Sequence, residues 1–237
     1  MVQAAYLALG DESLGPQAMI DGGALSALRT AAVSAVATRV LARRDASRLV
    51  IFGAGVRAHA PLRAMTAVRS IDRVVSVNRR AQRSTLILTL ARALGVEATR
   101  GEAACVRDAD VVCTCTTSTW PVFDGRLLSP GAHVNAIGAY QPNSRQLDDA
   151  TVTRGRVFVE DRSAALSEAG DLVIPVKAGC LDPAAVAGDL FGLCSGAVGR
   201  VDSDEITIVK SVGLAVDDLA IADALLEALQ DRVTAGV

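Results

Sequence analysis

A glycine-rich loop, Gly53-Ala54-Gly55-Val56-Arg57-Ala58, is the segment whose residue types point most directly to chemistry. It follows the apolar stretch of residues 48–52 and precedes a segment of helical composition. In dinucleotide-binding folds, a first glycine permits the tight strand-to-helix turn, and a second lets backbone N–H groups approach a pyrophosphate. The helix N-terminus also favours the negative charge of the phosphates. The loop therefore predicts a dinucleotide site with cofactor-binding residues Gly53, Gly55, Val56 and Arg57.

The residues that end the next strand indicate which dinucleotide the site prefers. An acidic residue there would hydrogen-bond the adenosine ribose 2′-hydroxyl and repel a 2′-phosphate. This chain instead has Asn78, followed by Arg79 and Arg80. Arginine forms charge-assisted, often bidentate bonds to phosphate, so Asn78 and Arg79 favour NADP(H) over NAD(H) as the cofactor. The alternative is that Arg79 and Arg80 are ordinary surface charges.

The elements that must position these residues alternate along the chain. Strand patterns cover residues 48–52, 73–77, 110–115, 133–137, 156–160 and 205–209, with a further one at residues 2–9. Helical patterns cover residues 24–44, the segments ending near residues 70 and 94, and residues 216–233. Strands separated by helices are typical of βαβ units. We therefore expect an α/β fold with a Rossmann-type doubly wound parallel sheet.

Composition agrees with this fold and excludes some partners. Hydrophobic residues make up 51% of the 237 residues and aromatic residues only 3%, which suits the aliphatic core of a parallel sheet covered by helices. The net charge of −2 argues against a nucleic-acid partner, which would favour a basic surface. No apolar run approaches the roughly 20 residues that a membrane span needs. We expect a cytoplasmic protein without a membrane partner.

The cysteines and histidines do not indicate a metal site. The five cysteines follow no secretory signal, and Cys113 and Cys115 lie in an apolar run where small buried hydrophobes are expected. Neither His59 nor His133 lies near a second ligand at metal-binding spacing. We expect no metal and no disulfide.

Several stretches, in order along the chain, resemble the ornithine cyclodeaminase/mu-crystallin family. They are residues 28–32, the Gly53 loop, residues 115–118 with Pro121-Val122, residues 130–138, residues 168–172, and residues 210–213 with Asp218-Leu219. Each stretch is weak evidence by itself, but together they are specific, and they cover residues from about 20 to 230.

The resemblance implies a Rossmann domain and a substrate and dimerisation domain built from both chain ends. The expected division is residues 46–204 for the NAD(P)-binding domain, with residues 1–45 and 205–237 forming part of the second domain. Family members reduce cyclic imines, oxidise amino acids or convert ornithine to proline, all with a nicotinamide cofactor. The resemblance also implies a homodimer.

Residue by residue, the resemblance assigns roles to one arginine and to the ends of three strands. Arg29 matches the arginine that grips the substrate carboxylate, for which a guanidinium is well suited. Ser211 and Gly213 match the segment that approaches the nicotinamide, and Asp218 matches an aspartate that follows it. Cofactor contacts are expected from the ends of two further strands, namely Thr116, Thr117, Ser118, Asn135, Ile137 and Gly138.

The chain departs from the family pattern at Tyr140. In the cyclodeaminase branch, an aspartate at this place takes part in proton transfer. A phenol with an ordinary pKa of about 10 is a poor general base near neutrality, so Tyr140 disfavours ammonia elimination from ornithine. The imine reductases of the family also lack the aspartate. Tyr140 is expected to donate a hydrogen bond to the imine or to wall the pocket.

A second departure is that the segment before Arg29 is shorter than in family members, where it supplies a lysine near the substrate. The chain upstream of Asp21 offers no basic residue in its place. The proton donor is therefore unassigned, and catalysis and the family dimer depend on whether the short segment suffices.

The sequence leads to one principal hypothesis and three alternatives. The principal one is NADP(H)-dependent reduction of a small cyclic ketimine carboxylate, such as pyrroline- or piperideine-2-carboxylate, with Arg29, Ser211 and Tyr140 as catalytic residues. The alternatives are an ornithine cyclodeaminase or amino-acid dehydrogenase, a non-catalytic NADPH-binding protein, and a truncated fragment.

Overall fold

Eight parallel strands form the main sheet of the protein, for which a computed structural model describes residues 4–10 and 14–234. The strand order is β5-β4-β3-β6-β7-β10-β8-β9. Their bounds are β3 (Arg48–Phe52), β4 (Arg73–Val77), β5 (Glu97–Gly101), β6 (Val111–Thr114), β7 (His133–Ala136), β8 (Gly155–Val159), β9 (Gly188–Asp189) and β10 (Ile206–Lys210). From β3 the chain first extends the sheet through β4 and β5 and then returns to the other side with β6 and β7. The predicted α/β parallel sheet is confirmed.

Helices cover both faces of this sheet. The longer ones are α1 (Gly22–Leu41), α2 (Val56–Val68), α3 (Ser84–Ala93) and α8 (Ala215–Thr234); the shorter ones are α4 (Asp149–Arg154), α5 (Arg162–Glu168), α6 (Gly170–Lys177) and α7 (Leu190–Ser195). Four 3₁₀ turns complete the described part of the chain: η1 (Ala81–Arg83), η2 (Ala103–Asp108), η3 (Gly125–Leu127) and η4 (Pro183–Ala185).

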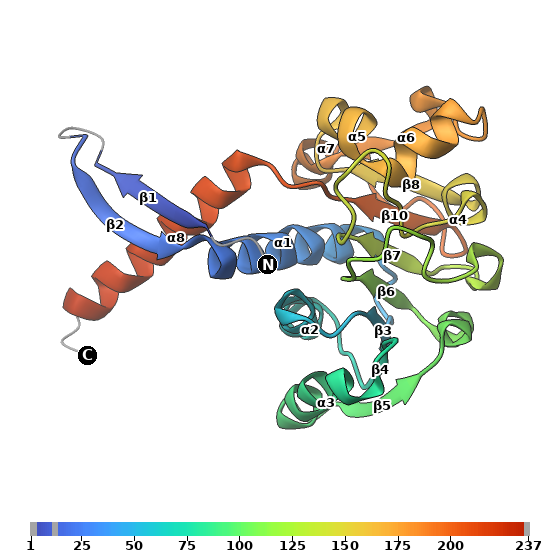
Figure 1. Cartoon of the computed structure of the whole chain (residues 1–237), viewed down its shortest axis with the longest axis horizontal. Helices are drawn as coiled ribbons and strands as arrows, with labels where there is room; N and C mark the ends of the chain where they lie inside the picture. The colour runs from blue at the N-terminus through green and yellow to red at the C-terminus, as the bar shows by residue number, and fades with distance from the viewer. Residues whose placement is uncertain (1–3, 11–13, 235–237) are drawn as a thin grey trace.

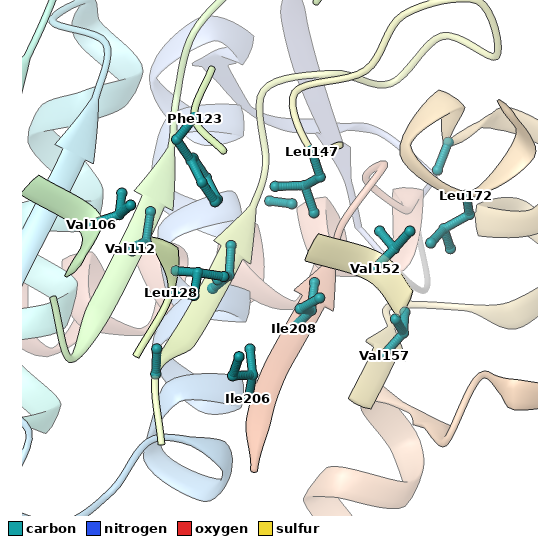
Figure 2. Packing of buried hydrophobic residues seen from close by; sticks show 14 of the residues in the cluster. Val106, Val112, Phe123, Leu128, Leu147, Val152, Val157, Leu172, Ile206 and Ile208 are labelled. Atoms are coloured by element: carbon teal, nitrogen blue, oxygen red, sulfur yellow. The ribbon is translucent and has the colours of Figure 1, made fainter. Parts of the chain in front are cut away.

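The two faces hold separate hydrophobic clusters because successive strand side chains point in opposite directions. On β3, Leu49 and Ile51 pack under α2 and α3, whereas Val50 and Phe52 belong to the cluster on the opposite face, which also includes residues of η2, α4 and α6. Figure 2 shows the second cluster, in which Phe123, Leu128 and Leu147 lie over the strands. The core is almost entirely aliphatic, as the low aromatic content predicts.

A two-stranded antiparallel hairpin, β1 (Ala5–Leu9) and β2 (Pro16–Asp21), stands apart from the sheet. Figure 1 shows this hairpin and α8 extending away from the sheet, with α1 running from the hairpin to the sheet. Both chain ends thus contribute to one extension of the molecule. The predicted strand over residues 2–9 corresponds to β1, and its first two residues lie outside the described part of the chain.

The expected domain boundary at residue 205 needs a correction. Strand β10 lies inside the main sheet, between β7 and β8, and pairs with both of them in parallel. Residues 206–210 therefore belong to the sheet, and only α8 continues into the extension. The boundary came from the resemblance, which assigns the C-terminal segment as a whole to the second domain.

Helix α1 also differs from the sequence-based expectation about apolar runs. It has 20 residues, and by length and composition alone it could cross a membrane. In this fold its C-terminal half packs on the sheet, where Ala37 and Leu41 contact β8 and β10 residues. Its apolar composition is explained by this burial.

Candidate functional site

The Gly53 loop joins β3 to α2 at the carboxyl edge of the sheet. Gly53 has a φ of +107°, and a Cβ on it would stand 2.6 Å from the Cys115 carbonyl oxygen, so the turn requires glycine. At Gly55, by contrast, a Cβ would meet nothing within 4 Å. The packing of the chain thus explains Gly53 but not Gly55, whereas a ligand lying against the backbone would explain both.

The start of α2 differs from the helices that begin with a side-chain cap. Aspartate side chains cap α1, α4, α5 and α7 through Asp21, Asp148, Asp161 and Asp189. Helix α2 begins at Val56, and its N-cap residue Gly55 supplies no side-chain cap. The Ala58 N–H donates to the Gly55 carbonyl at 2.9 Å, and the two N–H groups that precede it at the helix start remain for an anionic ligand. The side chains of Val56 and Arg57 lie outside the described part of the structure, and their roles stay predictions.

Asn78, just after β4, is held in place by two serines. Its Nδ2 donates to Ser76 Oγ at 3.0 Å and to Ser84 Oγ at 2.9 Å. Arg79 and Arg80 are exposed, and neither forms an ion pair with another described residue. The adenosine end of the expected site therefore combines a fixed neutral amide with two arginines that are free to meet a phosphate.

The turn after β6 is fixed by Gln146, a residue that the sequence analysis missed. Gln146 Nε2 donates to the Thr116 carbonyl at 2.5 Å and to Thr116 Oγ1 at 2.8 Å, and Ser118 N donates to the same hydroxyl at 2.9 Å. A Cβ on Gly138 would collide with this pair, which explains the glycine after β7. Thr117 is exposed at the tip of the turn. No local pattern could have identified Gln146, because it lies in an irregular loop.

The expectation that Asn135 contacts the cofactor is corrected. Its side chain is fully buried, and its Nδ2 donates to Thr38 Oγ1 of α1 at 2.9 Å. Asn135 therefore joins α1 to the sheet beneath the surface, where a ligand cannot reach it. Ile137, which follows β7, is also buried but lies at the edge of the sheet, and its contact with a cofactor stays a prediction.

Arg29 lies where α1 passes the loop between β10 and α8. Its side chain is 13% exposed, and its Nε donates to Asp218 Oδ1 at 3.2 Å. A Cβ on Gly213 would stand 2.5 Å from the guanidinium, so the two residues are in direct contact. The structure thus brings together three residues that the sequence analysis singled out from opposite chain ends.

Ser211, at the end of β10, is tied to a second residue that the sequence analysis missed, Glu160. Ser211 Oγ donates to Glu160 Oε1 at 3.0 Å, while the N–H groups of Val212 and Gly213 donate to Oε2 at 2.9 and 2.6 Å. The Glu160 carboxylate is buried, and these three donors compensate its charge. Glu160 directly follows β8, so its position at a strand end is the signal that could have identified it.

Asp217, in the first turn of α8, accepts the N–H of Leu214, which follows the two N–H groups that Glu160 accepts. Burial raises the pKa of Asp217 to about 6, and the neighbouring Glu160 charge adds to this rise. Arg29 acts in the opposite direction by favouring the ionised form. Asp217 is therefore an acid that titrates near neutrality at the edge of the candidate site.

A buried ion pair fixes the loop that carries Tyr140. Lys210 Nζ lies 2.9 Å from Asp171 Oδ2, with both side chains fully buried, and it also donates to the Ala139 carbonyl. Asp171 Oδ1 in turn accepts the N–H groups of residues 146 and 147. Tyr140 is 49% exposed, so its ring is available at the surface of an anchored loop.

Cys113 and His133 lie in the core, whereas Cys180 and Cys194 are exposed. Burial raises the pKa of the Cys113 thiol to about 12 and lowers the pKa of His133 to about 3. His133 Nδ1 is within 2.9 Å of Thr207 Oγ1. Among the described residues, no group of three or more His, Cys, Asp and Glu could hold a metal ion.

Comparisons with known proteins identify the family of the chain. Residues 2–232 match the model of the ornithine cyclodeaminase/mu-crystallin family. A Delta(1)-pyrroline-2-carboxylate reductase of Bacillus cereus is 38% identical over 222 residues, which cover 90% of this chain and 66% of that protein. This chain therefore spans about two thirds of the length of that relative.

Two solved structures have the same fold over nearly the whole chain. The Delta(1)-pyrroline-2-carboxylate reductase of Thermococcus litoralis, in complex with NADH and L-proline, superimposes with a TM-score of 0.93 at 31% identity, covering 99% of this chain and 73% of that one. An archaeal alanine dehydrogenase dimer with bound NAD gives a TM-score of 0.89 at 27% identity, covering 99% and 72%.

Proposed function

Because the chain belongs to the ornithine cyclodeaminase/mu-crystallin family, we propose that it is an NADP(H)-dependent reductase of a small cyclic ketimine carboxylate. The observation that carries this proposal is the contact between Arg29 and Gly213. The contact brings a guanidinium, a group suited to binding a carboxylate, against the loop that follows β10, a central strand of the parallel sheet. In open α/β sheets, ligands bind at this carboxyl edge. The relatives named as pyrroline-2-carboxylate reductases support the substrate class.

The cofactor would extend along the carboxyl edge of the sheet. Gly53, Gly55 and the uncapped start of α2 fit a pyrophosphate, since the loop leaves backbone N–H groups and open space there. Asn78 and Arg79 would hold the adenosine end, and the free arginines favour a 2′-phosphate. The turn of Thr116, Thr117 and Ser118 would line the path toward the nicotinamide.

In the proposed reaction, the residues of the chain orient the substrate. When bound, the nicotinamide would supply the hydride that reduces the imine carbon, and a proton would be added to the ring nitrogen. Arg29 would hold the substrate carboxylate by charge-assisted hydrogen bonds, and its own pairing with Asp218 fixes the guanidinium. Ser211 and Gly213 would set the distance between the substrate and the nicotinamide, a contribution that comes from orientation.

Tyr140 favours the reductase over the cyclodeaminase. Its phenol is exposed on an anchored loop, where it can donate a hydrogen bond to the imine or wall the pocket. Ammonia elimination needs a base near neutrality, and a phenol is poorly suited to that role. A cyclodeaminase would release ammonia from ornithine, which is the direct test of this second candidate.

We also propose that two chains associate through the extension formed by the hairpin and α8. Leu7, Leu9, Leu14 and Met19 of the hairpin region are at least half exposed, and an isolated two-stranded hairpin is only marginally stable in water. A second copy would cover this apolar surface. The archaeal alanine dehydrogenase is a dimer, which supports the proposal.

The experiment that tests the function follows NADPH oxidation with pyrroline-2-carboxylate and piperideine-2-carboxylate and identifies the products. We expect the cyclic amino acid to form in a one-to-one ratio with the NADPH consumed. NADPH binding without turnover of either imine would contradict the proposal and would favour a cofactor-binding protein.

A further inference from the structure

Two carboxyl groups from different elements meet beside the loop of residues 211–214. Glu160 follows β8, and Asp217 lies in the first turn of α8. Glu160 Oε2 accepts the N–H groups of Val212 and Gly213, and Asp217 Oδ2 accepts the next N–H along the chain, that of Leu214. Glu160 is buried and Asp217 is partly buried, so solvent screens their mutual repulsion only weakly.

Both carboxyl groups hold the same loop. Glu160 accepts the Ser211 hydroxyl and two successive backbone N–H groups. Asp217 Oδ2 accepts the N–H of Leu214 at 3.3 Å. The conformation of this loop, including the positive φ of Gly213, therefore depends on how the two acids are placed relative to each other.

Two neighbouring carboxyl groups repel each other when both are ionised, and this repulsion is relieved when one of them carries a proton. The charged groups that face Asp217 are Glu160 from β8, Arg29 from α1 and Asp218 from its own helix. Lys210, at the end of β10, is bound to Asp171 instead. Arg29 alone does not neutralise three acids, and it already donates to Asp218.

We propose that Glu160 and Asp217 share one proton, and that this proton keeps the 211–214 loop and the Arg29 guanidinium in the arrangement that receives the substrate carboxylate. Asp217 is then a proton-dependent positioning residue. The inference rests on the proposed reductase function for its effect on catalysis, but the shared proton itself does not depend on that function.

Loss of the proton has two consequences. The ionised Asp217 repels Glu160, which loosens the loop that both residues hold. It also becomes a second acidic partner for Arg29 and so competes with an anionic substrate. Both effects weaken substrate binding, and we expect KM for the ketimine carboxylate to rise with pH more than kcat falls. An anionic substrate bound to Arg29 would conversely favour the protonated acid.

The sign of the effect on stability follows from the raised pKa of Asp217 in the folded protein. A folded state that holds a proton more tightly than the unfolded state loses stability as pH rises from the unfolded value, about 3.9, through the folded value. The shared proton therefore stabilises the fold most at low pH, and its contribution is lost as pH passes about 6.

The test compares Asp217→Asn with Asp223→Asn in the full chain. An asparagine at position 217 can donate a hydrogen bond to Glu160 at every pH, so it retains the contact without a titrating proton. Asp223 is exposed on the same helix, and its substitution removes the same charge without touching the loop. Because both variants receive the same substrate, titration of the imine cancels in their ratio.

Two readouts decide the proposal. We expect the kcat/KM of Asp217→Asn, divided by that of Asp223→Asn, to rise by about tenfold between pH 5.5 and 8. The rise should come mainly from KM, and its size corresponds to an interaction energy of about one pKa unit. We also expect the midpoint of thermal unfolding of Asp217→Asn, relative to Asp223→Asn, to rise by about 2–4 °C over the same range.

Ratios that stay constant with pH in both readouts would overturn the shared proton. Turnover by both variants with a flat kcat/KM ratio would overturn its role in positioning while leaving the reductase function intact. If neither variant nor the wild type turns over an imine, the proposed function fails, and the unfolding comparison alone then decides whether the proton is shared.

Discussion

The guanidinium of Arg29 lies directly against Gly213, so close that a Cβ on the glycine would stand 2.5 Å from Nη2. The two residues are far apart in the sequence, and they meet because α1 crosses the sheet beside β10. Gly213 also has a φ of +94°, a conformation that favours glycine. The contact therefore links the expected carboxylate site to the loop that follows β10.

Replacing this glycine should damage the site more than the fold. We expect Gly213→Ala to lower kcat/KM by at least about tenfold, because the new methyl group displaces Arg29, a change worth about 1.4 kcal/mol or more. Gly95→Ala is the matched control, since Gly95 has a φ of +75° and open space around it. Both variants bear similar backbone strain, so equal activities would show that the Arg29 contact does not matter.

The two glycines of the Gly53 loop should respond differently to substitution. Gly55→Ala should leave the unfolding midpoint unchanged, because its Cβ meets nothing within 4 Å, but it should weaken NADPH binding by about tenfold through its closer approach to the pyrophosphate. Gly53→Ala should destabilise the protein, since it combines a positive φ with a backbone collision. Cofactor titration by fluorescence and thermal unfolding separate the two effects. Unchanged NADPH affinity in Gly55→Ala would place the pyrophosphate elsewhere.

The preference for NADP(H) should depend on Arg79. We expect Arg79→Ala to raise the Kd for NADPH by about tenfold, the cost of one charge-assisted hydrogen bond, and to leave the Kd for NADH unchanged. Arg92→Ala is a suitable control, because Arg92 is an exposed arginine in the last turn of α3. An equal loss of affinity for both cofactors, or tighter binding of NADH by the wild type, would contradict the assignment.

The buried ion pair of Lys210 and Asp171 should be essential for stability. Lys210→Met leaves a fully buried carboxylate without its cation, a change that typically costs about 3–5 kcal/mol. Urea unfolding monitored by circular dichroism should show this loss. A decrease below about 1 kcal/mol would mean that Asp171 is satisfied by the two N–H groups that it accepts.

The sheet was largely predictable, because long apolar strands and the Gly53 loop have strong local signals. Strands β3 and β4 have the bounds that the sequence predicts. Strand β5 was missed because Glu97–Gly101 lies at the sheet edge and lacks an apolar pattern. The short helices α4 to α7 were missed because tertiary packing, more than periodicity, stabilises helices of six to eight residues.

The site was predictable only in part. Arg29, Ser211 and Gly213 were identified by resemblance to a family, and the structure brings them together. Asn135 was wrongly assigned because its match to a family segment at a strand end does not reveal that its side chain is buried against α1. Glu160 accepts hydrogen bonds from the loop of residues 211–213. This loop is about 50 residues away along the chain, so the fold and not the sequence spacing brings the two together.

The most direct test of the proposed function is NADPH oxidation with pyrroline-2-carboxylate by the wild type, Arg29→Ala and Arg39→Ala. Arg39 is an exposed arginine in the last turn of the same helix, so its variant controls for the loss of a charge on α1. We predict turnover by the wild type and Arg39→Ala, and a loss of about 100-fold in kcat/KM for Arg29→Ala, in line with the removal of a largely buried charged partner. Equal turnover by all three proteins would contradict the assignment of Arg29, and no turnover by any of them would contradict the reductase itself.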